Sequence, residues 1–215
     1  MVSKLRQARN TERREKTRQA LILAAGTVFA RKGYHATLIS DIVAEIGVGQ
    51  GTFYRSFENK RHIADALFDQ VVESLFAEFS PMSSQAPTNV EAYRQASIDA
   101  VVRVALVIER NRELVLMFLR EGPSIDGEFE QKLESVTDRF AGLARSLLEL
   151  AIQGGFARPC DTEYVSQCIV GIGLRQIHLY LKNKLGDKST SDIATEIVDF
   201  AFWGIGPRER SRSNS

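Results

Sequence analysis

Residues 37–60 constrain the fold more than any other part of this 215-residue chain. They hold two short segments whose apolar residues recur every four positions, which is the spacing of one face of an α-helix. Gly47 and Gly49 separate the segments, and Phe53 and Phe57 share one face of the second. The polar side chains between the two rings must point away from that face. Two short helices around a glycine-containing turn are the parts of a helix-turn-helix, which indicates DNA as the partner.

Charge is divided unevenly along the chain, although its net value is only +1. Residues 1–61 hold 12 Lys and Arg against 5 Asp and Glu, a net +7, and residues 62–215 hold 16 against 22, a net −6. A basic segment is attracted to a polyanion such as DNA, whereas an acidic one is not. The charge distribution therefore supports DNA binding by an argument that did not need the motif.

Composition and cysteine usage exclude several classes of protein. The chain is 44% apolar and 26% charged, as in ordinary globular proteins, and it has no apolar run of membrane-spanning length and no secretory signal. We therefore expect a cytoplasmic protein. Its two cysteines lack the spacing of a metal site, its three histidines are scattered, and no nucleophile stands in a recognisable context. The sequence predicts no enzyme, no metal and no cofactor.

Apolar periodicity predicts an all-α fold of about nine helices, because no stretch alternates with period two. We expect a flexible basic arm over residues 1–10 and a helix-turn-helix domain over residues 11–61. A larger helical domain should cover residues 62–205, followed by a flexible tail over residues 206–215. Thr37 should be the N-cap of the second helix, and Gly49 should stand where the third begins. Residues 80–89, rich in Ser and Pro, should form a surface loop.

The last two helices, expected over residues 161–185 and 191–203, each carry two apolar stripes. A helix on the outside of a monomer needs only one buried face. The second stripe therefore predicts a homodimer through these two helices. The alternative is that both helices are central to the fold of a monomer.

Residues 33–60 also resemble a known family. The order Gly-Tyr-His-Ala-Thr, followed by Asp-Ile-Val-Ala-Glu-Ile-Gly-Val-Gly-Gln-Gly-Thr-Phe-Tyr-Arg-Ser-Phe-Glu-Asn-Lys, is similar to the amino-terminal signature of the TetR family of bacterial transcriptional regulators. The match covers roughly residues 15–68, and the remainder resembles the family only in length and order of helices. The resemblance implies a three-helix DNA-binding domain, and a larger domain that dimerises around a small-molecule pocket and releases DNA on ligand binding.

Candidate DNA contacts divide into groups that fix register on phosphates and groups that reach base edges. The candidates are Thr37, Gln50, Gly51, Thr52, Tyr54, Arg55 and Lys60. The resemblance implies phosphate contacts for Thr37, Tyr54 and Lys60. Thr52 and the amide of Gly51 can donate to phosphate too, whereas Gln50 suits adenine and Arg55 suits guanine. Arginines of the basic arm can follow the adjacent backbone or enter the minor groove. For any single one of these residues, a solvated side chain is the alternative.

Candidate ligand contacts are weaker, because only polar residues in apolar surroundings distinguish a pocket from a core. The candidates are Met117, Phe118, Phe140, Arg175 and His178. The three apolar ones can line a cavity or belong to the plain core. For Arg175 and His178 a pocket, a dimer interface and a satisfied core position all remain open. Arg103, spaced with other charged residues, should lie on a solvated stripe.

These features favour a ligand-responsive transcriptional regulator, in the form of a repressor. It would bind a palindromic operator as a homodimer and be released by a small-molecule effector. The alternative is a ligand-independent DNA-binding protein whose large domain serves protein–protein contact.

Overall fold

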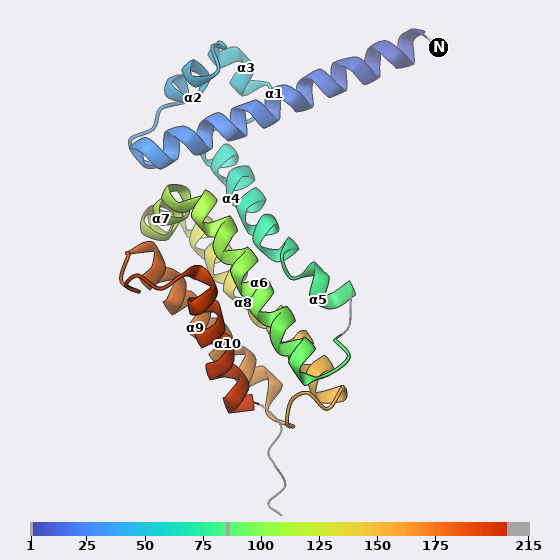
Figure 1. Ribbon diagram of the computed structural model, residues 1–215. Coiled ribbons are helices and arrows are strands. Elements are labelled where there is room, and N and C mark those ends of the chain that lie inside the picture. Colours follow the sequence, from blue (N-terminus) through green and yellow to red (C-terminus); the bar gives the residue numbers. More distant parts are fainter. Residues whose placement is uncertain (1, 85–86, 206–215) are drawn as a thin grey trace, which may run out of the picture. The chain divides into compact units, whose positions relative to one another are not determined.

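The computed structural model describes residues 2–84 and 87–205, which form helices joined by turns and loops, with no strand (Figure 1). In chain order the elements are α1 (Val2–Lys32), α2 (Ile39–Glu45), α3 (Gln50–Tyr54), α4 (Lys60–Ala77), α5 (Ser80–Ser84), α6 (Val90–Arg110), α7 (Arg112–Glu121), the 3-10 helix η1 (Gly122–Ser124), α8 (Gly127–Gln153), α9 (Thr162–Leu181) and α10 (Thr190–Ile205). The expected all-α fold is confirmed for the described residues, with one α-helix more than the sequence predicted. None of the helices in these residues is long and apolar enough to span a bilayer.

The chain divides into two compact units. The first contains the residues up to Glu73 and returns for Asn111–Leu133, and the second contains Ser74–Arg110 and the residues from Glu134 onward. The helix-turn-helix therefore shares its unit with most of α4, with α7 and η1, and with the start of α8. The sequence placed the division at residue 61, because periodicity within one helix does not show where its packing partner changes.

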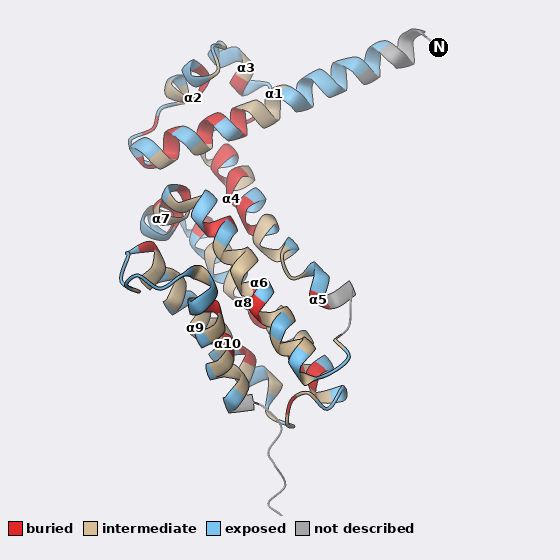
Figure 2. Ribbon diagram, in the orientation of Figure 1, coloured by how far each residue is buried: buried red, intermediate tan, exposed pale blue. Residues whose placement is uncertain are grey.

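The core of the first unit forms between the second half of α1 and the helix-turn-helix. Leu21, Val28 and Phe29 of α1 are fully buried, as their spacing predicts. Phe53 and Phe57 are 0% and 1% exposed, and their ring centroids lie 5.7 Å apart. Figure 2 shows this buried stretch where α1 passes α2 and α3. The prediction that the two rings hold α3 in the core is confirmed.

A second aromatic cluster of the same unit joins α4 to α7 and α8. The ring of Phe68 lies 5.1 Å from that of Phe118 and 5.2 Å from that of Phe129. Met117, on α7, is 1% exposed. Burial of large aromatic side chains contributes strongly to stability, so this cluster ties α7 and the start of α8 to the DNA-binding segment.

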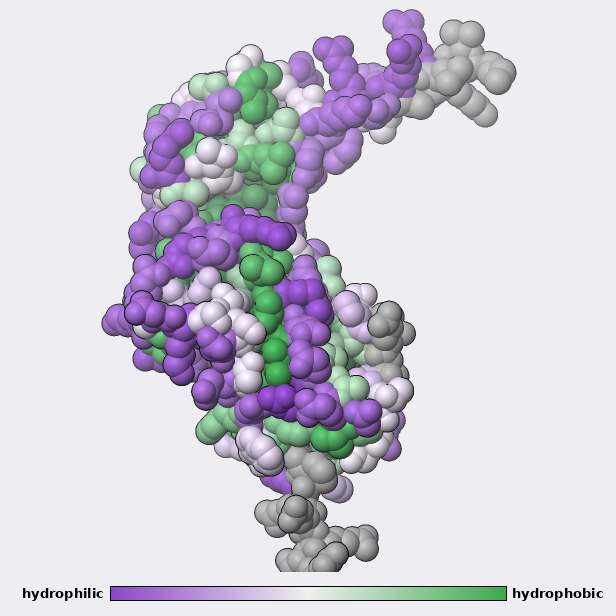
Figure 3. Space-filling model, viewed as in Figure 1, coloured by the Kyte–Doolittle hydropathy of each residue, from purple (hydrophilic) through white to green (hydrophobic). Residues whose placement is uncertain are grey.

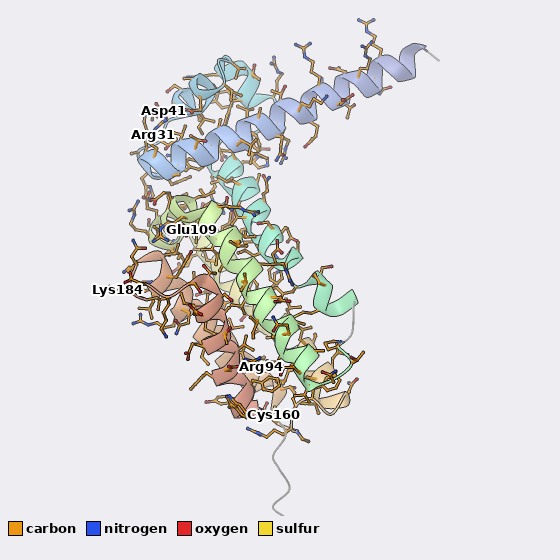
Figure 4. The ribbon with its side chains drawn as sticks, in the orientation of Figure 1. Arg31, Asp41, Arg94, Glu109, Cys160 and Lys184 are labelled. Carbon is orange, nitrogen blue, oxygen red and sulfur yellow. The ribbon has the colours of Figure 1, made fainter. Side chains whose placement is uncertain are left out.

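In the second unit α10 packs along α6. Ile98 of α6 contacts Ala194 and Val198 of α10 in one buried cluster. The guanidinium of Arg94 donates to both carboxylate oxygens of Asp199, at 2.6 and 2.9 Å (Figure 4). A bidentate pair of this kind fixes the register of the two helices as well as their distance.

Two local expectations about the chain are wrong. α1 begins at Val2 rather than after a flexible arm over residues 1–10. Residues 2–25 contain neither Gly nor Pro, and Glu12 pairs with Lys16 one turn later at 2.7 Å, so the helix continues without an apolar stripe. The expected loop at residues 80–89 contains α5, because Pro81 lies in the first turn, where its missing N–H is not needed. The predicted tail, residues 206–215, lies outside the described residues.

Candidate nucleic-acid interface

A tight turn between α2 and α3 sets the direction of α3. Gly47 adopts a φ of +67°, a conformation that side chains disfavour, and the N–H of Val48 closes the turn on the carbonyl of Val43 at 3.0 Å. Gly49 is the N-cap of α3, and its carbonyl accepts the N–H of Thr52 at 2.9 Å. The prediction that the third helix starts at Gly49 is confirmed.

α3 presents polar groups on the side opposite its buried ring. Gln50 and Arg55 are exposed, and Tyr54 is 55% exposed. Thr52 is half-buried, and its hydroxyl oxygen accepts a hydrogen bond from Arg55 Nη2 at 2.8 Å. A Cβ added to Gly51 would meet no atom within 4 Å, so the backbone there is open to solvent. Five of the predicted DNA contacts thus lie together on or beside one short helix.

Thr37, by contrast, lies inside the molecule. Its side chain is fully buried, and its hydroxyl donates to the carbonyl of Gly33 at 2.6 Å. The N-cap of α2 is Leu38, whose N–H donates to the carboxylate of Asp41 at 2.9 Å. The prediction that Thr37 caps α2 is wrong, because its hydroxyl turns back to the end of α1 and Asp41 takes the free amide. In this conformation the Thr37 hydroxyl does not reach the surface.

The amine of Lys60 is turned inward as well. It donates to the carbonyl oxygens of Tyr34 at 2.7 Å, Thr37 at 2.8 Å and His35 at 3.3 Å. It also lies 4.4 Å from the centroid of the Tyr34 ring. Burial lowers the pKa of Lys60 below the ordinary lysine value. The amine predicted to contact phosphate is therefore engaged with the turn between α1 and α2.

Glu121, at the end of α7, holds the same turn from the other side. Its carboxylate accepts the N–H of His35 at 3.2 Å, and the ring of His35 makes a 2.9 Å hydrogen bond with the hydroxyl of Ser124. Gly33 has a φ of +80°, and a Cβ there would lie 2.6 Å from a Glu121 oxygen. Burial opposes ionisation of Glu121, but hydrogen bonds from Arg120 and from the backbone of His35 and Tyr34 outweigh it and lower its pKa.

Sequence reasoning missed Glu121, which follows no local motif and lies 86 residues from His35. Only the glycine requirement at Gly33 gives a signal, and that signal does not name the partner. The turn between α1 and α2 is thus held by an amine on its carbonyl oxygens and a carboxylate on its amides. Because both groups are charged, these hydrogen bonds are stronger than neutral ones.

Two ion pairs join α1 to α2 beside this turn, and one member of each, Arg31 and Asp41, is labelled in Figure 4. Arg31 lies 3.1 Å from a carboxylate oxygen of Glu45, and Lys32 lies 2.7 Å from one of Asp41. The hydrogen bond from Lys32 and that from the Leu38 amide lower the pKa of Asp41. Carboxylates thus neutralise the cations at the carboxyl end of α1.

The candidate ligand contacts are divided between the two units. Met117 and Phe118 are buried in the first unit, and the ring of Phe118 contacts that of Phe68. Phe140, in the second unit, stacks on the ring of Phe76 at 4.2 Å. Both environments favour the core alternative for the apolar candidates.

Arg175 and His178 are exposed on α9, which excludes the satisfied core position for them. The charge of Lys182, then burial and the charge of Arg175, lower the pKa of His178. Their exposure favours an interface over a closed pocket, and the second unit offers a different polar anchor in Arg103.

Arg103 is half-buried and does not lie on a solvated stripe as the sequence predicted. Its Nε and Nη2 donate to the carbonyl of Glu78, at 3.3 and 2.8 Å, and Nε lies 3.4 Å from the Glu78 carboxylate. The arginine therefore anchors the chain just after α4 to α6. Among the described residues, no group of three His, Cys, Asp or Glu side chains has the arrangement of a metal site.

The helix-turn-helix segment is the part of this chain that matches a family model. Residues 21–67 match the model of bacterial regulatory proteins of the tetR family. The chain is 28% identical over 149 residues to the uncharacterized HTH-type transcriptional regulator YhgD of Bacillus subtilis, covering 68% of this chain and 75% of that one. It is 26% identical over 159 residues to the fatty acid metabolism regulator protein of the same organism, covering 70% and 76%.

Solved structures share the fold of nearly the whole chain. The transcriptional regulator FadR from Bacillus subtilis, in complex with stearoyl-CoA, matches with a TM-score of 0.71 and 21% identity over 87% of this chain and 98% of that one. At this identity the likeness shows the fold alone. The relatives named here are regulators and not enzymes, in agreement with the function class predicted from the sequence.

Proposed function

Because this chain belongs to the TetR family of bacterial regulatory proteins, we propose that it is a ligand-responsive transcriptional repressor. It binds a palindromic operator as a homodimer and is released by a small-molecule effector. The observation that carries this proposal is the accessible polar face of α3, which stands on a buried aromatic core.

The exposed side chains of α3 have two roles in DNA recognition. Gln50 and Arg55 reach base edges in the major groove, where amide and guanidinium groups each form two hydrogen bonds with a preferred purine. Tyr54, the Thr52 hydroxyl and the Gly51 amide bond phosphates and so fix the position of α3 on the duplex. Release of Arg55 from Thr52, a single exposed hydrogen bond, is a small cost for both roles.

Thr37 and Lys60 support DNA binding through the turn between α1 and α2. Their polar atoms bond to backbone carbonyl oxygens of that turn, at 2.6–3.3 Å. A phosphate contact by either residue would require breaking these bonds. The burial that lowers the pKa of Lys60 supports the same assignment.

A homodimer through α9 and α10 is supported by apolar side chains on the outer faces of these helices. Tyr164 is 69% exposed and Leu174 43% on α9, and Phe200 is 71% and Trp203 84% exposed on α10. Large exposed apolar side chains of this kind favour an interface, and the same faces on two copies can form a closed symmetric pair. A dimer that reads two half-sites on one side of the duplex places its recognition helices about 34–36 Å apart, or more for wider spacing.

The effector binds the second unit and shifts the dimer toward a state with low DNA affinity. An acyl thioester is the first class to test, because one relative is named for fatty acid metabolism and a solved structure of the same fold contains stearoyl-CoA. The Arg103–Glu78 contact offers a polar group next to the apolar residues of this unit.

Selection of duplexes from a random-sequence pool by the full-length protein tests the DNA-binding part. We expect a palindrome, bound by two chains, as judged by mobility shift. An unrelated set of sequences bound by single chains would contradict it.

Addition of small molecules to the protein–DNA complex tests the effector. If the effector is an acyl thioester, micromolar stearoyl-CoA should release the DNA. Release by a cell extract but not by stearoyl-CoA would assign the effector to another chemical class. DNA binding that neither stearoyl-CoA nor the cell extract diminishes would favour the ligand-independent alternative.

A further inference from the structure

The first turns of α1 extend well beyond the core of the first unit. Leu21 is the first buried side chain among the described residues of α1, whereas the described side chains from Arg6 to Lys16 are exposed. Figure 3 shows this part of the helix as a hydrophilic projection. At a rise of 1.5 Å per residue, Arg6 stands roughly 22 Å from Leu21 along the helix axis.

Three arginines of this projection share one face. Arg6, Arg9 and Arg13 are three and four residues apart, the spacing of neighbours along a helix. Glu12 and Glu15 are turned away from the middle of this face by about 90° and 150°. Both carboxylates therefore lie off this face, and we refer to Arg6, Arg9 and Arg13 as the arginine stripe.

The two glutamates are occupied by other cations. Glu12 lies 2.7 Å from Lys16, and Glu15 lies 3.9 Å from Arg18. In the part of the chain that the structure describes, no ion pair joins a carboxylate to a guanidinium of the arginine stripe. Three exposed guanidinium groups thus remain available to an anionic partner.

The arginine stripe lies on a side of α1 from which one side chain reaches the helix-turn-helix. Arg31 marks that side, because it reaches Glu45 of α2 at 3.1 Å. Arg13 precedes Arg31 by about five complete turns of helix, so the two side chains leave α1 in nearly the same direction. The stripe therefore leaves α1 in the direction in which Arg31 reaches α2.

We propose that the arginine stripe is a second DNA contact, in which Arg6, Arg9 and Arg13 bond phosphates of the duplex that flanks the half-site. The proposal rests on the DNA-binding function proposed above and adds a contact to it that α3 does not make. Guanidinium groups are well matched to phosphate, and phosphate contacts need no particular sequence. A membrane surface is disfavoured as the partner, because the face opposite the stripe is polar rather than apolar.

Replacing the stripe with glutamine measures its contribution. For Arg6→Gln/Arg9→Gln/Arg13→Gln, bound to a duplex selected by the full-length protein, the slope of log K against log salt should flatten by about 2.7 for each bound chain. Affinity at low salt should fall by at least about tenfold. The control Arg110→Gln/Arg139→Gln/Lys188→Gln removes the same charge from exposed positions of the second unit outside α9 and α10, and it should leave the slope unchanged. Equal slopes for both triple variants would overturn the proposal.

A charge-neutral rearrangement tests the face itself. The variant Gln7→Arg/Arg9→Gln/Thr11→Arg/Arg13→Thr keeps the composition and net charge of α1 but moves two exposed cations to the opposite side of the helix. Its salt slope should fall by about 1.8 for each bound chain. A slope like that of the wild type would mean that only overall charge matters, which contradicts a defined stripe.

Replacing all three arginines of the stripe with lysine tests phosphate as the target. This variant should keep most of the affinity, because lysine also binds phosphate. A loss as large as with glutamine would contradict phosphate as the target.

The length of the duplex provides an independent readout. The projection can cover about six base pairs, at 3.4 Å each. Trimming that many base pairs outside each half-site should weaken the wild type and leave the triple glutamine variant unaffected, and equal losses for both would count against the stripe. If the wild type selects no duplex, the proposed function fails, whereas a wild type that binds while the stripe makes no difference refutes this inference alone.

Discussion

The turn between α1 and α2 and the outer faces of α9 and α10 differ in which groups they leave unsatisfied. In the turn, backbone carbonyls and amides are bonded by Lys60 and Glu121, and the hydroxyl of Thr37 is buried. On α9 and α10, large apolar side chains such as Phe200 and Trp203 stand in solvent. Because the polar groups of the turn are already hydrogen-bonded, the turn needs no binding partner and supports α3. An exposed apolar face lacks a partner, and the predictions below test whether that partner is a second copy of this chain.

The largest effect is expected from placing a charge on the exposed apolar face of α10. Phe200→Glu places two carboxylates at a symmetric interface, where desolvation and repulsion oppose pairing. Because Phe200 is 71% exposed within one chain, the monomer should fold normally. Sedimentation at micromolar concentration should give the 24.0 kDa monomer, and operator affinity should fall by about 10²–10⁴-fold as bivalent binding is lost.

Leu119→Glu is the matched control, since Leu119 is 50% exposed but lies on α7 in the first unit. It should leave the dimer intact. A Phe200→Glu chain that sediments as the wild type does would contradict an interface at α10.

Removing the cation from the turn tests its role as a support. Lys60→Met leaves three backbone carbonyls without their charged donor. The free energy of unfolding should fall by about 2 kcal/mol in urea titrations, while the salt slope of DNA binding stays as in the wild type. The opposite result, unchanged stability with a slope lower by about 0.9 for each bound chain, would assign Lys60 to phosphate as the resemblance implied.

Glu121 should make the support sensitive to acid. Its pKa is lowered from 4.5 in the folded chain, so its stabilisation is complete above that value and is lost as the pH falls through the folded pKa. At pH 7, Glu121→Gln should be less stable than the wild type by about 1 kcal/mol, because glutamine accepts the backbone N–H bonds without a charge. The difference between the two proteins should shrink at pH 3.5. An equal difference at both pH values would show that the charge of Glu121 does not matter.

Local patterns predicted the parts of this interface that depend on neighbours in sequence. The period of four that contains Phe53 and Phe57, and the glycines of the turn before α3, place the recognition helix without any knowledge of the tertiary structure. Glu121 could not be found this way, because its partner His35 lies 86 residues away. Thr37 had the residue type and position of an N-cap, but the hydrogen bond to Gly33 competes with that role and wins in the folded chain.

The start of α1 shows a different limit. Apolar periodicity detects helices that pack on a core, whereas the described side chains from Arg6 to Lys16 are exposed, so the pattern predicted no helix before Thr11. Helix propensity and the Glu12–Lys16 pair were the available signals, and they were sufficient. The same absence of packing leaves the arginine stripe exposed.

The smallest expected effect concerns base recognition by α3. Gln50 is exposed at the start of α3, so Gln50→Ala should not change stability. It should reduce discrimination at one base pair of each half-site by about 1 kcal/mol, and it should leave the salt slope unchanged because no phosphate contact is lost. Tyr54→Phe is the matched control, since loss of its hydroxyl should weaken all operator variants equally. Competition binding with a set of single-base operator variants gives the measurement. If Gln50→Ala weakened every variant by the same factor, as Tyr54→Phe should, Gln50 would belong with the groups that position α3 rather than with those that read the sequence.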